Sequence, residues 1–134
     1  MILRILTAVA VLVSAWVHFD LWPVVRDNNV IGPAFLLNGI AGVVIALMVL
    51  FWRHWVPPLL AIGFGLSTIG AFVISATVGM YGVHEHWTGF SVWAAFIAEV
   101  VAVVAGALLL LRERPVRSGS AAQSGEHASS SNVR

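Results

Sequence analysis

The sequence predicts an all-α transmembrane protein, an antiparallel four-helix bundle with a disordered C-terminal tail. Of its 134 residues, 60% are hydrophobic and 10% are charged, whereas a soluble domain carries roughly 25% charged residues. Four apolar runs are each long enough to cross a bilayer, which takes about 20 helical residues. Small residues recur along two of these runs at a spacing that lets helices pack closely in lipid.

The four predicted spans cover residues 2–20, 33–52, 58–80 and 89–111. The first could instead be a signal peptide, because Val13-Ser14-Ala15 resembles a cleavage site. An uncleaved span is favoured because its helical pattern continues through His18. The second and third spans begin at Gly32-Pro33 and Pro57-Pro58, since proline fits the first turn of a helix.

Small residues at every fourth position predict the packing faces of the last two spans. On the third span they are Gly63, Ser67, Ala71, Ser75 and Gly79, and on the fourth they are Ala94, Ala98, Ala102 and Gly106. Packing within a bundle of residues 1–112 is the favoured interpretation. Contact with a membrane-protein partner, or with a second copy in a homo-oligomer, is the alternative.

Composition changes after the fourth span. Residues 113–134 are dominated by Ser, Gly, Ala, Gln and Arg without apolar periodicity, so they predict a disordered tail. Arg4, Arg53 and Arg112 lie at one end of the predicted bundle, and the other end carries only Arg26. The positive-inside rule then predicts a multi-pass protein of the plasma membrane with both termini in the cytoplasm.

Several classes of function are excluded or disfavoured. The chain has no cysteine, which excludes disulfides and thiolate metal sites. A net charge of +1 is too small to indicate a nucleic-acid partner. No hydrolase, nucleotide-binding or zinc-protease motif occurs. No catalytic residue is therefore assigned, and a role other than enzyme is favoured.

Polar residues gather toward the predicted outer end of the bundle. The ligand-binding or proton-handling candidates are His18, Asp20, Asn38, Glu85 and Glu99. Glu99 lies roughly 12 to 16 Å below the start of its span at about 1.5 Å per residue. A carboxylate at that depth costs at least about 2.5 kcal/mol unless it is protonated, paired or hydrated. One interpretation is a glutamate that ties helices together through Asn38 or His18; the others are proton transfer and ligand binding.

The stretch YGVHEHW places His84 and His86 two residues apart. On an extended segment both side chains point the same way and could share a divalent metal, with Asp20 or Glu85 as a further ligand. A solvated turn is the favoured alternative. Haem held by His18 with His84 or His86 is another hypothesis, and quinone is a third.

The chain resembles small four-span integral membrane proteins of actinomycete-like bacteria. The similarity covers about residues 1–112 and rests mainly on the opening of the second span, IGPAFLLN at Ile31, together with HFDLW at His18, GVHEHW at Gly82 and the late Glu99. A composition without lysine, rich in Ala, Val and Arg, fits the same source. The resemblance implies the four-span fold and the membrane location, and it carries over no catalytic residue.

Three functions follow as hypotheses. The first is an accessory or ligand-binding membrane component, in the lipid bilayer, with an outward-facing polar cluster. The second is a membrane-embedded metal, haem or quinone site with a redox or proton-transfer role. The third is a small proton-coupled transporter, which would need a homo-oligomer because four spans leave little room for alternating access.

Overall fold

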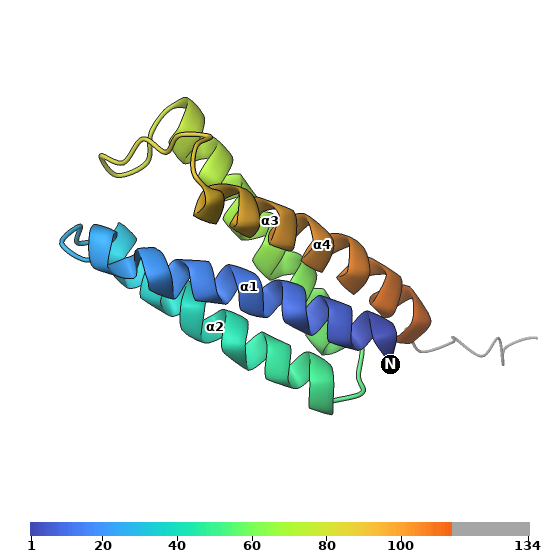
Figure 1. The fold of residues 1–134 in the computed structure, drawn as a ribbon. Helices are drawn as coiled ribbons and strands as arrows, with labels where there is room; N and C mark the ends of the chain where they lie inside the picture. Colours follow the sequence, from blue (N-terminus) through green and yellow to red (C-terminus); the bar gives the residue numbers. More distant parts are fainter. Residues whose placement is uncertain (114–134) are drawn as a thin grey trace, which may run out of the picture.

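The computed structural model describes residues 1–113 and contains the predicted four helices. They are α1 (Ile2–Val25), α2 (Ile31–Phe51), α3 (Val56–Thr77) and α4 (Phe90–Glu113), and no strand occurs within the described residues. They form the expected bundle of antiparallel neighbours (Figure 1). The predicted tail lies outside the described residues, except for Glu113, which ends α4.

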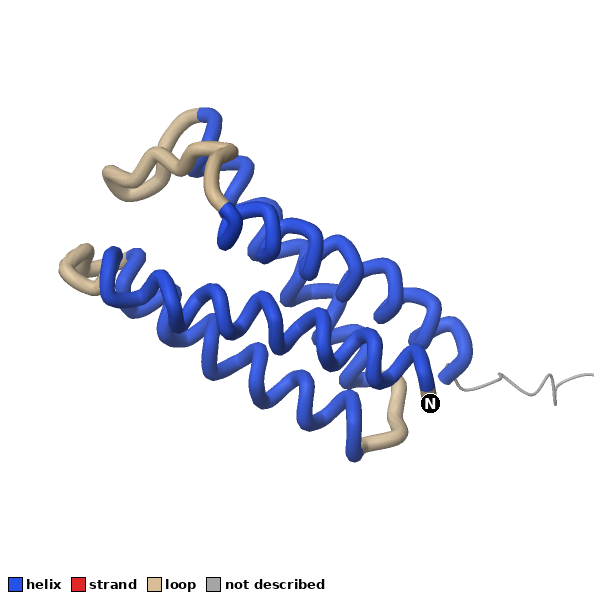
Figure 2. The backbone as a smooth tube through the Cα atoms, in the orientation of Figure 1, coloured by secondary structure: helices blue, strands red, loops and turns tan. Residues whose placement is uncertain are grey.

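The helices associate as two pairs. The α1 helix packs most extensively against α2 and next against α4, α3 packs mainly against α4, and α2 and α3 touch least. Figures 1 and 2 show the α1–α2 and α3–α4 pairs close together near the N-terminus and diverging toward the opposite end. That opposite end carries the α1–α2 and α3–α4 connections.

Each helix is long and apolar enough to cross a membrane. The outer faces expose large hydrophobic side chains, such as Trp16, Leu37 and Ile97, which are 71%, 68% and 57% exposed. Contiguous apolar surface of this kind is typical of a face that meets lipid. The chain is therefore a small multi-pass integral membrane protein.

The helix ends differ from the predicted spans for local reasons. The α1 helix continues through Pro23 to Val25, although proline has no N–H to donate to the carbonyl group four residues earlier. The α2 helix begins at Ile31, since Asn28 Oδ1 accepts the N–H groups of Val30 and Ile31. The α3 helix stops at Thr77 instead of reaching residue 80. Gly79, at φ 80°, follows it in the left-handed conformation that closes many helices.

The predicted packing stripe on α4 is confirmed at Ala98, Ala102 and Gly106, which are buried, and not at Ala94, which is only partly buried. The stripe predicted on α3 is wrong at Gly63, Ser67 and Ala71, which are exposed, although Ser75 is buried as expected. A Cβ atom on Gly63 would meet nothing within 4 Å, whereas one on Gly65 would lie 2.9 Å from the carbonyl oxygen of Glu99. The buried face of α3 is instead formed by Ala61, Phe64, Gly65 and Thr68, together with Pro57, Pro58 and Ser75. The rotation of α3 about its own axis is determined by burial of the large Phe64 ring. Burying this ring is more favourable than packing Gly63 against a neighbouring helix.

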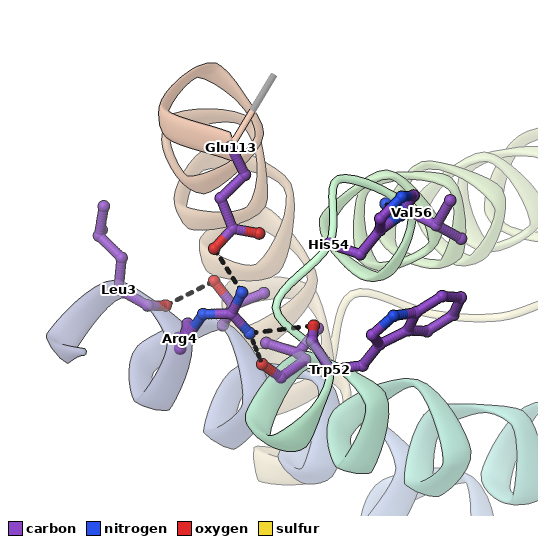
Figure 3. Close-up of polar contacts among 8 residues, drawn as sticks. Leu3, Arg4, Trp52, His54, Val56 and Glu113 are labelled. Atoms are coloured by element: carbon purple, nitrogen blue, oxygen red, sulfur yellow. Dashed lines mark hydrogen bonds and ion pairs between the residues drawn. The ribbon is translucent and has the colours of Figure 1, made fainter. Parts of the chain in front are cut away.

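A buried arginine holds the other end of the bundle together. Arg4 is 5% exposed, and its guanidinium donates to the carbonyl oxygens of Val49 and Trp52 at the end of α2 and to the Glu113 carboxylate of α4 (Figure 3). Cations are favoured at helix C-termini, where carbonyl groups lack partners within the helix. Arg4, expected only as a topology signal, therefore also joins three helices.

Candidate functional site

A cavity of about 160 Å³ lies between the two helix pairs where they diverge. Its lining follows helical spacing, with residues three or four apart on each helix facing inward. The side chains form three layers along the helices. By position along the helices, the floor has Val17, His18, Asn38, Thr68 and Glu99; the middle has Ala34, Phe35, Ala71, Phe72, Ala95 and Phe96; and the mouth has Leu21, Ile31, Ser75, Met80, Val83, Glu85 and Val92.

His18 is fixed in the floor by a hydrogen bond at each ring nitrogen. Nδ1 lies 2.8 Å from the carbonyl oxygen of Ser14, and Nε2 lies 3.1 Å from Asn38 Nδ2. A carbonyl oxygen can only accept and an amide nitrogen can only donate, so Nδ1 carries the hydrogen and Nε2 accepts. With the Asn38 amide nitrogen facing Nε2, His18 is in its neutral Nδ1–H tautomer.

Glu99 lies on the same floor and is 4% exposed. Ser14 Oγ donates to its Oε1 at 2.9 Å, and the Thr68 hydroxyl lies beside its carboxyl group. Glu99 therefore links α4 to α1, as the interpretation of a helix-tying glutamate expected. Its partner is Ser14, one helical turn from His18, and not Asn38 or His18 itself.

The α3–α4 connection covers the mouth of the cavity. It begins with a tight turn in which Met80 and Val83 exchange two backbone hydrogen bonds. Tyr81 and Gly82 both have positive φ angles, 49° and 83°, as in a type I′ turn. Ser75 Oγ donates to the Val83 carbonyl at 3.0 Å. This bond ties the turn back to the body of α3.

A second bond connects the two loops at this end. Asn28 Nδ2 donates to the Tyr81 carbonyl oxygen at 2.9 Å, while Asn28 Oδ1 caps α2. The same asparagine therefore positions both the start of α2 and the cover over the cavity. The two helix pairs are joined across the mouth by this contact.

The predicted site residues separate into two groups. His18, Asn38, Glu85 and Glu99 line the cavity, although they come from three helices and a loop. Asp20 is exposed on α1 and does not contribute to the lining. Sequence reasoning did not assign the floor residue Thr68 or the mouth residue Ser75 to the site. The sequence feature that could have identified them is that both are hydroxyl residues on the third span, spaced toward the end of the bundle that carries the other polar residues.

His84 and His86 alternate with Glu85 on a segment without helix or strand. Both histidines are exposed, and Glu85 turns toward the cavity. The His84 ring lies so close to Gly79 that it would clash with a Cβ atom at that position. Within residues 1–113 no group of three or more His, Cys, Asp or Glu side chains is placed to hold a metal ion. Metal binding by His84 and His86 stays a prediction from their spacing.

The haem hypothesis required His18 to coordinate iron. Both ring nitrogens of His18 already have partners, so an axial bond through Nε2 would have to displace Asn38. Axial ligation of haem iron uses a ring nitrogen that is free to bind it. The hydrogen bonds observed here are those of a structural or ligand-orienting histidine.

Comparison of the chain with protein-family models, with curated proteins and with solved structures finds no match.

Proposed function

We propose that this protein is a ligand-binding component of the plasma membrane whose cavity opens toward the outside of the cell. The observation that carries the proposal is the cavity of about 160 Å³ with an apolar middle and a polar floor. Binding sites for small molecules are typically apolar concavities with a few polar groups that fix the orientation of the ligand. An engineered apolar cavity of about 150 Å³ in another protein binds benzene, so a single six-membered ring is the expected scale.

Fluorobenzene is a suitable probe of the cavity, because it matches this scale and carries no charge. Its binding to purified protein in phosphatidylcholine nanodiscs is measured by ¹⁹F NMR. Ala95 lines the middle of the cavity, so Ala95→Leu fills the space. Ala94, the residue before Ala95 on α4, does not line the cavity. Ala94→Leu therefore adds the same side-chain volume outside the cavity.

Saturable binding is expected for the wild type and for Ala94→Leu, and not for Ala95→Leu. Partitioning of the probe into lipid is the same for all three samples, so the difference between them reports the cavity alone. Equal and non-saturable signals from all three would refute the proposed function.

The proposed orientation has its own test, because the chain contains no native cysteine. Thr88 is exposed in the α3–α4 connection, and Arg53 is exposed in the α2–α3 connection at the opposite end. In intact cells a membrane-impermeant maleimide should label Thr88→Cys and leave Arg53→Cys unlabelled until the membrane is opened. The reverse pattern would place the cavity on the cytoplasmic side.

A further inference from the structure

The hydrogen-bond donors around the cavity are almost all engaged by the protein itself. Thr68 Oγ1 donates to carbonyl oxygens of its own helix, at 2.9 and 3.0 Å, and Ser75 Oγ donates to Val83. A hydroxyl group has one hydrogen, so neither can donate to a ligand. His18 uses its only N–H on the Ser14 carbonyl. Asn38 uses one of its two N–H groups on His18.

The acceptors are not used up in the same way. A carboxylate has about four acceptor positions; on Glu99 one of them is taken by Ser14 Oγ, and the Thr68 hydroxyl lies beside the same carboxyl group. Asn38 Oδ1 and the lone pairs of Thr68 also belong to the floor, and Glu85 adds a second carboxyl group at the mouth. The cavity thus offers many acceptors and few donors to whatever enters it.

The formal charge of the lining has one sign. Among the described residues that surround the cavity, the charged types are Glu85 and Glu99, and none is arginine or lysine. His18 is neutral in the tautomer that its partners select. An apolar environment strengthens a pair of opposite charges and makes an unpaired one costly, so a cation is the complementary ligand charge.

The middle layer matches an aromatic or other apolar body. Phe35, Phe72 and Phe96 line it from three different helices. Trp87 supports two of these rings from behind, with ring centroids 4.5 Å from Phe72 and 5.3 Å from Phe96, both edge to face. Phenylalanine faces attract cations as well as rings. Glu99 lies one helical turn below Phe96 and Ala95, at the floor.

We propose that the ligand is a protonated amine on a small apolar body of about one ring, with its ammonium group on Glu99 and its ring between the three phenylalanines. The proposal rests on the proposed function and names the chemical class of its ligand. An ammonium group donates hydrogen bonds and carries positive charge, and the floor accepts hydrogen bonds and carries negative charge. A quinone would instead need donors for its two carbonyl oxygens, and an anion would face two carboxyl groups.

Three probes that share a fluorophenyl ring test the class directly. They are 2-(4-fluorophenyl)ethylamine, which is a cation at neutral pH, 2-(4-fluorophenyl)ethanol, which is neutral, and 4-fluorophenylacetate, which is an anion. Binding is measured by ¹⁹F NMR in nanodiscs of zwitterionic lipid, and the signal from Ala95→Leu is subtracted. The amine should bind about tenfold to a hundredfold more tightly than the alcohol, the range expected for a charge-assisted hydrogen bond, and the acetate most weakly.

Two variants assign the preference to the floor. Glu99→Gln should remove the preference for the amine while the alcohol still binds. Asp27→Asn makes the same change of charge on a side chain that is 97% exposed outside the cavity, and it should leave the preference intact. Equal affinities for amine and alcohol in the wild type would overturn the proposal even if Glu99→Gln did not fold, and so would a preference that survives in Glu99→Gln. If fluorobenzene binds and the amine shows no advantage, the ligand class is wrong and the proposed function stands.

Discussion

Substituting Gly65 by alanine tests how closely α3 approaches α4 beside the cavity. The new Cβ atom would lie 2.7 Å from Val103 Cγ2 and 2.9 Å from the Glu99 carbonyl oxygen. Carbon atoms in contact are about 3.5 to 4.0 Å apart, so the Val103 methyl would have to move by about 1 Å. The carbonyl oxygen belongs to the backbone of α4 and can move only with the helix. Overpacking of this kind typically costs about 1–3 kcal/mol.

Gly63→Ala is the matched control, two residues away on the same helix. Its Cβ atom would meet nothing within 4 Å. Both substitutions gain the same helix propensity, up to about 1 kcal/mol, so their difference isolates the contact with α4. We expect Gly65→Ala to be less stable than Gly63→Ala by about 1–3 kcal/mol.

The assay is reversible unfolding in mixed micelles with increasing SDS, followed by circular dichroism. The free energies of unfolding of both variants and of the wild type are compared at one detergent composition. Agreement of the two variants within about 0.5 kcal/mol, the usual limit of additivity, would refute the close approach at Gly65. A larger loss in Gly63→Ala would instead support the packing stripe expected from sequence.

The same assay checks two further contacts. Ser14→Ala removes the hydroxyl group that donates to the buried carboxyl group of Glu99 and should lower the free energy of unfolding by about 1–3 kcal/mol. Ser67→Ala loses only a hydrogen bond within its own helix and should lower it less. Equal losses in the two variants would contradict the link between α1 and α4. Arg4→Ala removes the guanidinium group that joins three helices and should lower the free energy of unfolding by about 3 kcal/mol. Arg53 is exposed, so Arg53→Ala should change that free energy little. An Arg4→Ala protein as stable as the wild type would show that this contact is dispensable.

The sequence was enough to predict several of the polar residues that line the cavity. His18, Asn38 and Glu99 were recognisable as polar residues on apolar spans, because burying them in lipid without a partner is costly. Their approximate depth followed from the helical rise. Their hydrogen-bonding partners could not be predicted, because the rotation of each helix about its axis depends on side chains that pack against it from other helices. Ser14 became the partner of Glu99 through that rotation.

The α3 helix illustrates the same limit. A repeat of small residues at Gly63 and Ser67 predicted one packing face, and the helix presents another, centred on Phe64 and Gly65. Both faces were compatible with close packing in lipid. The large Phe64 ring could be buried in only one of them, and a single sequence does not say which neighbour accepts it.

By itself, the sequence determined the number of spans, their length, the charge asymmetry between the two ends and the polar end of the bundle. These properties depend on hydropathy and on spacing along one chain, so they need no knowledge of neighbours. Only the tertiary structure decided that the two helix pairs diverge at that end, that three phenylalanine rings and two glutamates share a cavity there, and that Arg4 joins three helices at the other end. Those features depend on contacts between helices far apart in sequence, which arise from packing and not from the local pattern.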